Sequence, residues 1–170
     1  EWMNGEYIRA KNTAELVELC KPYWKEQGIE VDNFKKEYLE AVIELEKDRL
    51  KKLSEISERT SYFFSEPEYE GKMLVWKKSD VETTKQNLCL LLDLFRMTRD
   101  EIMAEIPKLE ETVKSFITAH DLDTGSVLWP LRLAMTGQEK SPSPFEVTAT
   151  LFAGQGREEV TKRLEKAISL

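Results

Sequence analysis

Apolar residues recur at intervals of three and four along most of the chain, which is the spacing of one face of an α-helix. Capping-box sequences at 12–15 and 79–82 predict two helix starts. Gly28 and Gly137 are expected to end helices, and Pro107 and Pro144 to lie in first turns. No segment alternates apolar and polar residues over a strand's length. The pattern predicts an all-α fold of roughly nine to eleven helices.

The helical pattern between residues 33 and 64 is long for one globular helix, so we expect a break near 51–54. The segment 65–71 reads SEPEYEG, which is typical of a turn and of a subdomain boundary. We therefore predict two consecutive helical-bundle subdomains. Residues 1–68 contain the end of a connecting segment and the first bundle, and residues 69–170 form the second.

Several local expectations follow from the same pattern. Residues 1–11 are expected to be an incoming linker whose Trp2, Met3, Tyr7 and Ile8 can pack. Asp32 is expected to cap a helix, and residues 153–156 are expected to form a loop. The last helix is expected to bury its apolar positions and to expose its basic ones: Val160, Leu164, Ala167 and Ile168 inside, and Arg157, Lys162, Arg163 and Lys166 outside. Cys20 and Cys89 both lie on apolar faces and are expected to be buried thiols in a reducing compartment.

Composition narrows the function classes. The net charge of −7 argues against a non-specific nucleic-acid binder, yet it leaves room for a reader that gathers a few Arg and Lys on one face. No apolar run approaches the roughly 20 residues that a membrane helix needs. The polar start resembles no signal peptide, and the absence of an initiator Met suggests a piece of a longer polypeptide.

Catalytic chemistry has little support in the sequence. His120 is the single histidine and has no Cys or His nearby, so we expect no zinc site. No spacing favours a Ser/His/Asp or Cys/His arrangement, and we expect no active site in this chain. The segment 154–157, GQGR, could cradle a phosphate at a helix start, but a flexible connector is the stronger interpretation.

Two arginines stand out. Arg132 lies between apolar neighbours, one turn before Gly137 and the loop 141–145, SPSPF. It is either a snorkelling residue at the edge of the core or a planar guanidinium that stacks on a splayed RNA base. The loop is either a plain linker between helices or a stiff frame for a small pocket. Arg49 lies where the second helix is expected to break, in a cluster of charges that is most often a solvated face.

Four segments together resemble the C-terminal region of bacterial-type glutamyl-tRNA synthetases. Residues 129–137 read WPLRLAMTG and 141–146 read SPSPFE, which is similar to the family signature PLR-x-A-hydrophobic-TG followed by [ST]-P-x-x-[FL]-[ED]. Residues 2–9, WMNGEYIR, resemble the segment that follows the catalytic half, and residues 59–64, RTSYFF, resemble a helix end before an aromatic turn. Their order and spacing hold over essentially the whole chain.

The resemblance implies two all-helical anticodon-binding subdomains of a glutamate–tRNA ligase. It implies that the site for ATP, magnesium and glutamate lies in a catalytic half absent here, so this fragment has no cofactor and no activity alone. The implied partner is tRNA(Glu), chiefly its anticodon loop, without DNA or membrane. The implied state is a cytoplasmic monomer.

The resemblance also assigns roles to six residues. Arg132 corresponds to an arginine that packs on anticodon bases, Ser141 and Pro142 to a pair that contacts the middle base, and Pro144 and Phe145 to residues that meet the first base. Arg49 corresponds to an arginine that reads the third base, which implies discrimination against tRNA(Gln).

Departures from the family pattern affect the first base most. Pro144 lacks a backbone N–H, Ser143 stands where Gly is common, and Asp123 stands where Lys is usual. A helical protein-interaction scaffold without RNA binding is the alternative hypothesis, and the acidity of the chain is its best argument.

Overall fold

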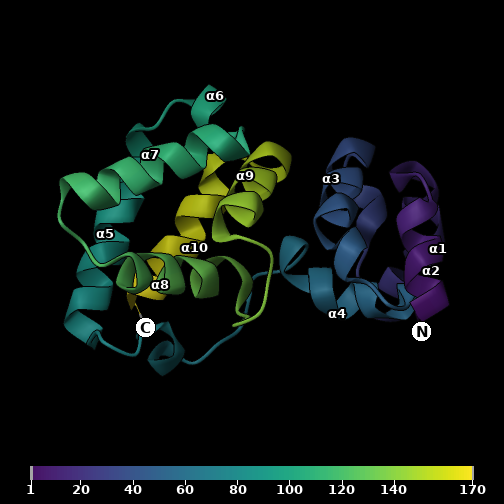
Figure 1. Cartoon of the computed structure of the whole chain (residues 1–170), viewed down its shortest axis with the longest axis horizontal. Coiled ribbons are helices and arrows are strands. Elements are labelled where there is room, and N and C mark those ends of the chain that lie inside the picture. The colour runs from purple at the N-terminus through teal and green to yellow at the C-terminus, as the bar shows by residue number, and fades with distance from the viewer. Residues whose placement is uncertain (1, 170) are drawn as a thin grey trace. The chain divides into compact units, whose positions relative to one another are not determined.

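The computed structural model describes residues 2–169, with side chains from Gly5 onward. This part contains ten α-helices, five short 3-10 helices and no strand, which confirms the all-α prediction (Figure 1). The chain forms two compact units, Glu1–Glu66 (unit 1) and Pro67–Leu170 (unit 2). The functional assignment of 1–68 and 69–170 to anticodon-binding subdomains stays a prediction.

Unit 1 is built from four α-helices and four 3-10 helices around one aromatic-rich core. They are α1 Trp2–Ala10, α2 Thr13–Glu26, η1 Val31–Asn33, α3 Lys36–Glu46, η2 Lys47–Arg49, η3 Leu53–Glu55, α4 Ile56–Thr60 and η4 Ser61–Phe63. As predicted, Asn12 caps α2 by accepting a hydrogen bond from the Glu15 N–H (3.1 Å). In the core, Trp24 is fully buried and its Nε1 donates to Thr60 Oγ1 at 2.9 Å, which ties α2 to α4.

The predicted break in unit 1 is confirmed, but it begins earlier and is wider than expected. Helix α3 ends at Glu46, η2 occupies residues 47–49 and η3 residues 53–55, and residues 50–52 between them are not helical. The expected linker at 1–11 is wrong, because α1 is helical there. Ile8 is buried as expected, whereas Tyr7 is exposed. The side chains of Trp2 and Met3, also expected to pack, lie outside the described residues. Asp32 does not cap α3: it lies in η1, and Lys35 precedes α3 without a side-chain cap.

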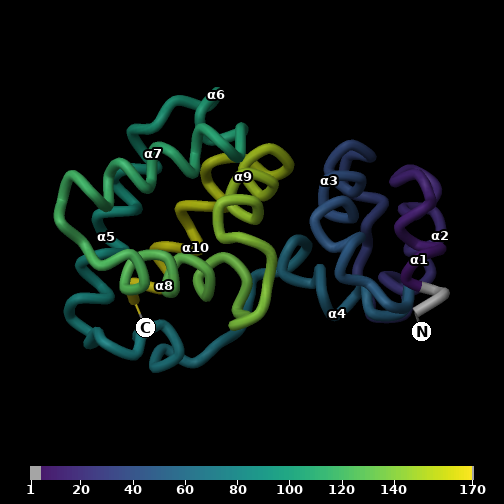
Figure 2. Tube along the Cα trace, in the orientation of Figure 1, coloured from purple at the N-terminus to yellow at the C-terminus, as the bar shows by residue number. Residues whose placement is uncertain are grey.

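In unit 2, three of the helices pack around the last one. Its elements are η5 Gly71–Leu74, α5 Val81–Met97, α6 Asp100–Met103, α7 Ile106–Ala119, α8 Thr124–Thr136, α9 Pro144–Gln155 and α10 Arg157–Ser169. Helix α10 packs against α5, α8 and α9, as its trace in Figure 2 shows. Its Val160, Leu164 and Ala167 are buried as predicted. The predictions for Pro107, Pro144 and Gly137 are confirmed: each proline lies in a first turn, and Gly137 ends α8 with φ +66°.

Arg163 is the clearest error of the helical pattern, which placed it outside. Its side chain is buried, Nε donates to Glu159 Oε1 at 2.7 Å, and Nη1 donates to the Met135 carbonyl oxygen at 2.6 Å. An ion pair within α10 and a carbonyl at the end of α8 therefore compensate its buried charge. Cys89 is also exposed rather than buried, whereas Cys20 is buried as predicted and its pKa is raised to about 12 by burial.

The expected loop at 153–156 is helical instead. Helix α9 continues to Gln155, and only Gly156, with φ +85°, separates it from α10. Arg157, the basic residue of the weaker phosphate-cradle interpretation, donates from Nη2 to the Thr98 carbonyl oxygen (2.6 Å) and pairs with Asp100. Its guanidinium therefore holds the end of α5, and the segment 154–157 does not form a phosphate loop.

The C-terminal helix also fixes the first residues of unit 2. Lys166 Nζ donates to the Pro67 carbonyl oxygen at 2.8 Å and lies 5.9 Å from the centre of the Tyr69 ring. Pro67 and Tyr69 in turn lie beside Gly137, whose hypothetical Cβ would come within 3.1 Å of Pro67 Cβ. The start of unit 2, the end of α8 and the last helix therefore meet at one place.

Gly125 in α8 permits the close approach of the Trp76 side chain, which comes from the segment between η5 and α5. A Cβ at this position would lie 2.4 Å from Trp76 Nε1 and 2.7 Å from Trp76 Cε2. Trp76 packs on Trp129, with ring centres 5.3 Å apart. We expect Gly125→Ala to destabilise unit 2 by about 1–3 kcal/mol, because the Trp76 ring must move. Tryptophan fluorescence during thermal unfolding measures this change.

Gly154→Ala is the matched control, because Gly154 is an exposed residue within α9. Alanine is the better helix former there, so a gain of about 0.5 kcal/mol is expected. Equal stability of Gly125→Ala and the unmodified chain would contradict a rigid contact between Trp76 and α8.

Candidate functional site

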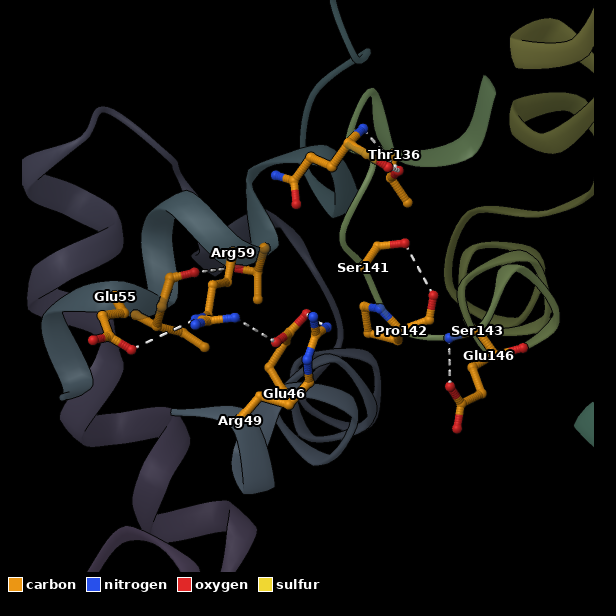
Figure 3. A network of polar contacts seen from close by, with 12 residues as sticks. Glu46, Arg49, Glu55, Arg59, Thr136, Ser141, Pro142, Ser143 and Glu146 are labelled. Carbon is orange, nitrogen blue, oxygen red and sulfur yellow. Dashed lines mark hydrogen bonds and ion pairs between the residues drawn. The ribbon is translucent and has the colours of Figure 1, made fainter. Parts of the chain in front are cut away.

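The loop between α8 and α9 is fixed by a helix end on each side. At the α8 end, Thr136 Oγ1 donates to the Arg132 carbonyl oxygen (2.8 Å) and accepts from the Gln138 N–H (3.0 Å). At the α9 start, Ser143 and Glu146 form a capping box, in which the Ser143 N–H donates to Glu146 Oε2 at 2.8 Å (Figure 3). The backbone between them is therefore ordered by local hydrogen bonds.

Arg132 binds the middle of this loop. Its Nη1 donates to the Ser141 carbonyl oxygen (2.9 Å), to Ser141 Oγ (2.7 Å) and to the Pro142 carbonyl oxygen (2.8 Å). The side chain is half-buried, and Ser141 Oγ donates to the Pro142 carbonyl oxygen (2.9 Å). The structure thus brings together three of the predicted site residues, Arg132, Ser141 and Pro142.

Pro144 and Phe145 lie in the first turn of α9 and are both buried. Only 4% of Phe145 is exposed. These two residues anchor the downstream end of the loop in the core of unit 2, and they present little free surface to a ligand.

Two departures from the family pattern have local structural roles. Asp123 is the N-cap of α8, and its Oδ2 accepts from the Ser126 N–H at 2.8 Å. Ser143 is the N-cap of α9. Both residue types are preferred at this position because a short side chain can accept a hydrogen bond from an otherwise unpaired helical N–H.

Arg49 belongs to a separate cluster in unit 1 (the Glu46 cluster: Glu46, Arg49, Glu55, Arg59 and Tyr62). Arg49 Nη1 donates to Glu46 Oε1 at 3.0 Å (Figure 3). Arg59 Nη1 lies 3.6 Å from the other oxygen, Glu46 Oε2, and Arg59 Nε lies 3.5 Å from Glu55 Oε2. Glu46 is buried, whereas 34% of the Arg49 side chain is exposed.

Tyr62 completes the Glu46 cluster. Burial is the main cause that raises the pKa of Tyr62, and the negative charge of Glu46 is the second. The phenol is therefore protonated at neutral pH. The cluster therefore has a buried negative charge on Glu46, a half-exposed negative charge on Glu55, and two half-exposed positive charges on the arginines. The sequence analysis missed Glu46 and Arg59. Glu46 continues the buried face of α3 after Leu39, Val42 and Ile43. A carboxylate at a buried helical position is unusual, and this could have identified Glu46 from the sequence.

Metal and membrane sites find no support within residues 2–169. There, no group of His, Cys, Asp and Glu side chains is arranged to hold a metal ion. None of the helices described combines the length and apolar content that a bilayer crossing requires.

Comparison with known proteins gives a consistent result. The family model described as an anticodon binding domain matches residues 15–168. The chain is 33% identical over 171 residues to a glutamate–tRNA ligase of Porphyromonas gingivalis, covering 99% of this chain and 31% of that protein. It is 31% identical over 169 residues to a glutamate–tRNA ligase of Thermus thermophilus, covering 99% of this chain and 34% of that protein.

A solved structure has the same fold. The crystal structure of a glutamate tRNA ligase from Elizabethkingia meningosepticum matches with a TM-score of 0.80 at 23% identity, over 99% of this chain and 31% of that one. The chain thus spans about a third of the length of the curated relatives it matches. Since the family model covers most of the chain and these ligases match it almost from end to end, the chain belongs to the anticodon binding domain family, in the form carried by glutamate–tRNA ligases.

Proposed function

We propose that this chain binds tRNA(Glu), chiefly at its anticodon loop, as part of an ATP-dependent ligase that attaches glutamate to tRNA(Glu). The observation that carries the proposal is the family match over residues 15–168. ATP and magnesium act in the catalytic half of such a ligase, and the segment 154–157 offers them no phosphate loop here. The proposed working state is a cytoplasmic monomer that binds neither DNA nor membranes.

In unit 2, Arg132, Ser141, Pro142, Pro144 and Phe145 are the proposed anticodon-binding residues. The hydrogen bonds from Arg132 to the loop support this assignment, because a loop that is ordered before binding loses less conformational entropy when RNA arrives. A guanidinium also has a flat face on which a base can stack. Pro144 and Phe145 are proposed to take part chiefly as the buried, rigid base of the loop, since little of either side chain is exposed to meet RNA directly.

In unit 1, Arg49 is proposed to read the third anticodon base. Cytosine, the third base of a glutamate anticodon, presents N3 and O2 as acceptors, and a guanidinium has donors only. Guanine, the third base of a glutamine anticodon, presents N1–H and N2–H donors there. Arg49 therefore favours tRNA(Glu) over tRNA(Gln), and the exposed third of its side chain is the part that supports this role.

Binding to a tRNA(Glu) anticodon stem-loop tests the proposal. We expect Arg132→Gln to weaken binding by roughly 5- to 20-fold, because glutamine cannot reach all three oxygens and the loop becomes less ordered. The loss should be similar for stem-loops with C or G as third base, since Arg132 is not assigned to that base. Fluorescence anisotropy at low and moderate salt measures both affinities.

Arg99→Gln is the matched control, because it removes the same charge from an exposed side chain of unit 2. An Arg132→Gln variant that binds like Arg99→Gln would contradict a role for the loop. No binding by the unmodified chain, even at low salt, would favour the scaffold alternative or a domain that binds only when joined to its catalytic half.

A further inference from the structure

We propose that Glu46 is a positioning residue for anticodon specificity: its buried carboxylate holds one edge of the Arg49 guanidinium and thereby aims the remaining donors at the third base. This inference rests on the proposed role of Arg49. It adds a residue that does not touch RNA. It also assigns a function to a buried charge whose contribution to the stability of unit 1 is a weak reason for its presence.

The burial of Glu46 is the first observation. The residue lies at the last position of α3 and is 1% exposed. An ionised carboxylate is costly to remove from water unless partners compensate it, and apolar residues of similar volume often replace buried ion pairs without loss of stability. Stability alone is therefore a weak reason for a glutamate at this position.

The second observation is how Arg49 is held. Among the described residues, its guanidinium donates a hydrogen bond to Glu46 alone, through Nη1. A guanidinium has five N–H donors in a rigid plane. Fixing one nitrogen to a buried anchor restricts the plane and leaves Nε and Nη2 for an RNA base. An unanchored arginine would lose more side-chain entropy on binding.

The third observation is that Glu46 has a second cationic neighbour. Arg59 Nη1 lies 3.6 Å from the other carboxylate oxygen of Glu46, and Arg59 also forms an ion pair with Glu55. Glu46 therefore stays compensated while Arg49 contacts a base, and RNA binding need not break the anchor. Because the anchor comes from the core and Arg49 follows in the next turn, the geometry is set by folding and not by the RNA.

The specificity of Glu46→Gln measures the positioning role. Glutamine keeps the shape of the side chain but removes the charge that holds the guanidinium. For the unmodified chain we expect roughly tenfold tighter binding to the stem-loop with C as third base than to the one with G. In Glu46→Gln this ratio should fall to about threefold or less. In the Glu46→Gln/Arg49→Gln double variant, the ratio should equal that of Arg49→Gln alone, because Glu46 acts through Arg49.

Glu37→Gln is the matched control, because it removes an exposed carboxylate from the same helix and should leave the ratio unchanged. If Arg49→Gln abolishes the preference and Glu46→Gln keeps it in full, Arg49 reads the base and the role of Glu46 is wrong. A lack of preference in the unmodified chain overturns both assignments.

A spectroscopic measurement on the unmodified, RNA-free chain decides the point even where Glu46→Gln fails to fold. Anchoring by Glu46 slows rotation of the Arg49 guanidinium, so its two Nη groups should give separate ¹⁵N signals, identified by their loss in Arg49→Gln. The exposed Arg99 should give one averaged signal. If the two Nη groups of Arg49 give one averaged signal, as those of Arg99 should, the positioning role of Glu46 is overturned, whatever the binding data show.

Discussion

The Arg49→Gln variant is expected to lose the preference for cytosine as third anticodon base. A wrong base at a bidentate contact costs about 1–3 kcal/mol, which corresponds to roughly a 5- to 140-fold difference in Kd. The side-chain amide of glutamine has both a donor and an acceptor, so it can adapt to either cytosine or guanine. The ratio of the two dissociation constants should therefore fall to within about twofold of unity, and binding titrations with the two stem-loops measure it.

Lys25→Gln provides the control for charge, since Lys25 is an exposed residue of unit 1 outside the Glu46 cluster. It should weaken binding to both stem-loops equally, if at all, because a lost electrostatic contact carries no base information. An Arg49→Gln variant that keeps the full preference would remove Arg49 from base reading. The membership of the chain in its family would not be affected.

The Arg163→Met variant is expected to destabilise unit 2 by about 3 kcal/mol. Methionine fills much of the same volume, but it leaves the Met135 carbonyl at the end of α8 without this donor and Glu159 without its ion-pair partner. Removing one partner of a buried ion pair typically costs about 3–5 kcal/mol, and partial exposure of Glu159 reduces the figure. Amide hydrogen exchange should show roughly 100-fold lower protection in α8 and α10.

Lys162→Met tests whether any loss of charge from α10 has the same effect. Lys162 precedes Arg163 in the helix but is exposed, so a change of at most about 0.5 kcal/mol is expected. If both variants lose the same protection, the buried contacts of Arg163 contribute nothing beyond helix propensity and surface charge.

Local signals predicted much of the fold. Asn12, Gly137 and the prolines at 107 and 144 determine helix ends through their own backbone and side-chain chemistry, so sequence alone locates them. The same reasoning gave a wrong prediction at 153–155, where a loop was expected and α9 continues. One alanine and two glycines at 153–156 suggest a loop, but α9 packs on α10, and tertiary contacts override a propensity difference of about 1 kcal/mol.

The candidate site was predictable only in part. Arg132 and the loop 141–145 are close in sequence, so their association followed from helix and turn signals. The anchoring of Arg49 depends instead on how deeply Glu46 is buried, which is decided by the packing of α3 against α2 and α4. The burial of Arg163 depends on a carbonyl oxygen 28 positions earlier in the chain. Helical periodicity carries no information about such a partner.

The bond between Lys166 and the Pro67 carbonyl has a consequence for synthesis on the ribosome. Every contact of unit 1 described above lies within the first 66 residues, so its core is complete in a nascent chain long before the last helix exists. Unit 2 cannot close in the same gradual way, because α10 supplies the inner surface for α5, α8 and α9 and the residue that fixes Pro67. During translation, unit 2 can therefore complete its core only when α10 leaves the exit tunnel, and until then the apolar faces of α5, α8 and α9 lack the helix that covers them.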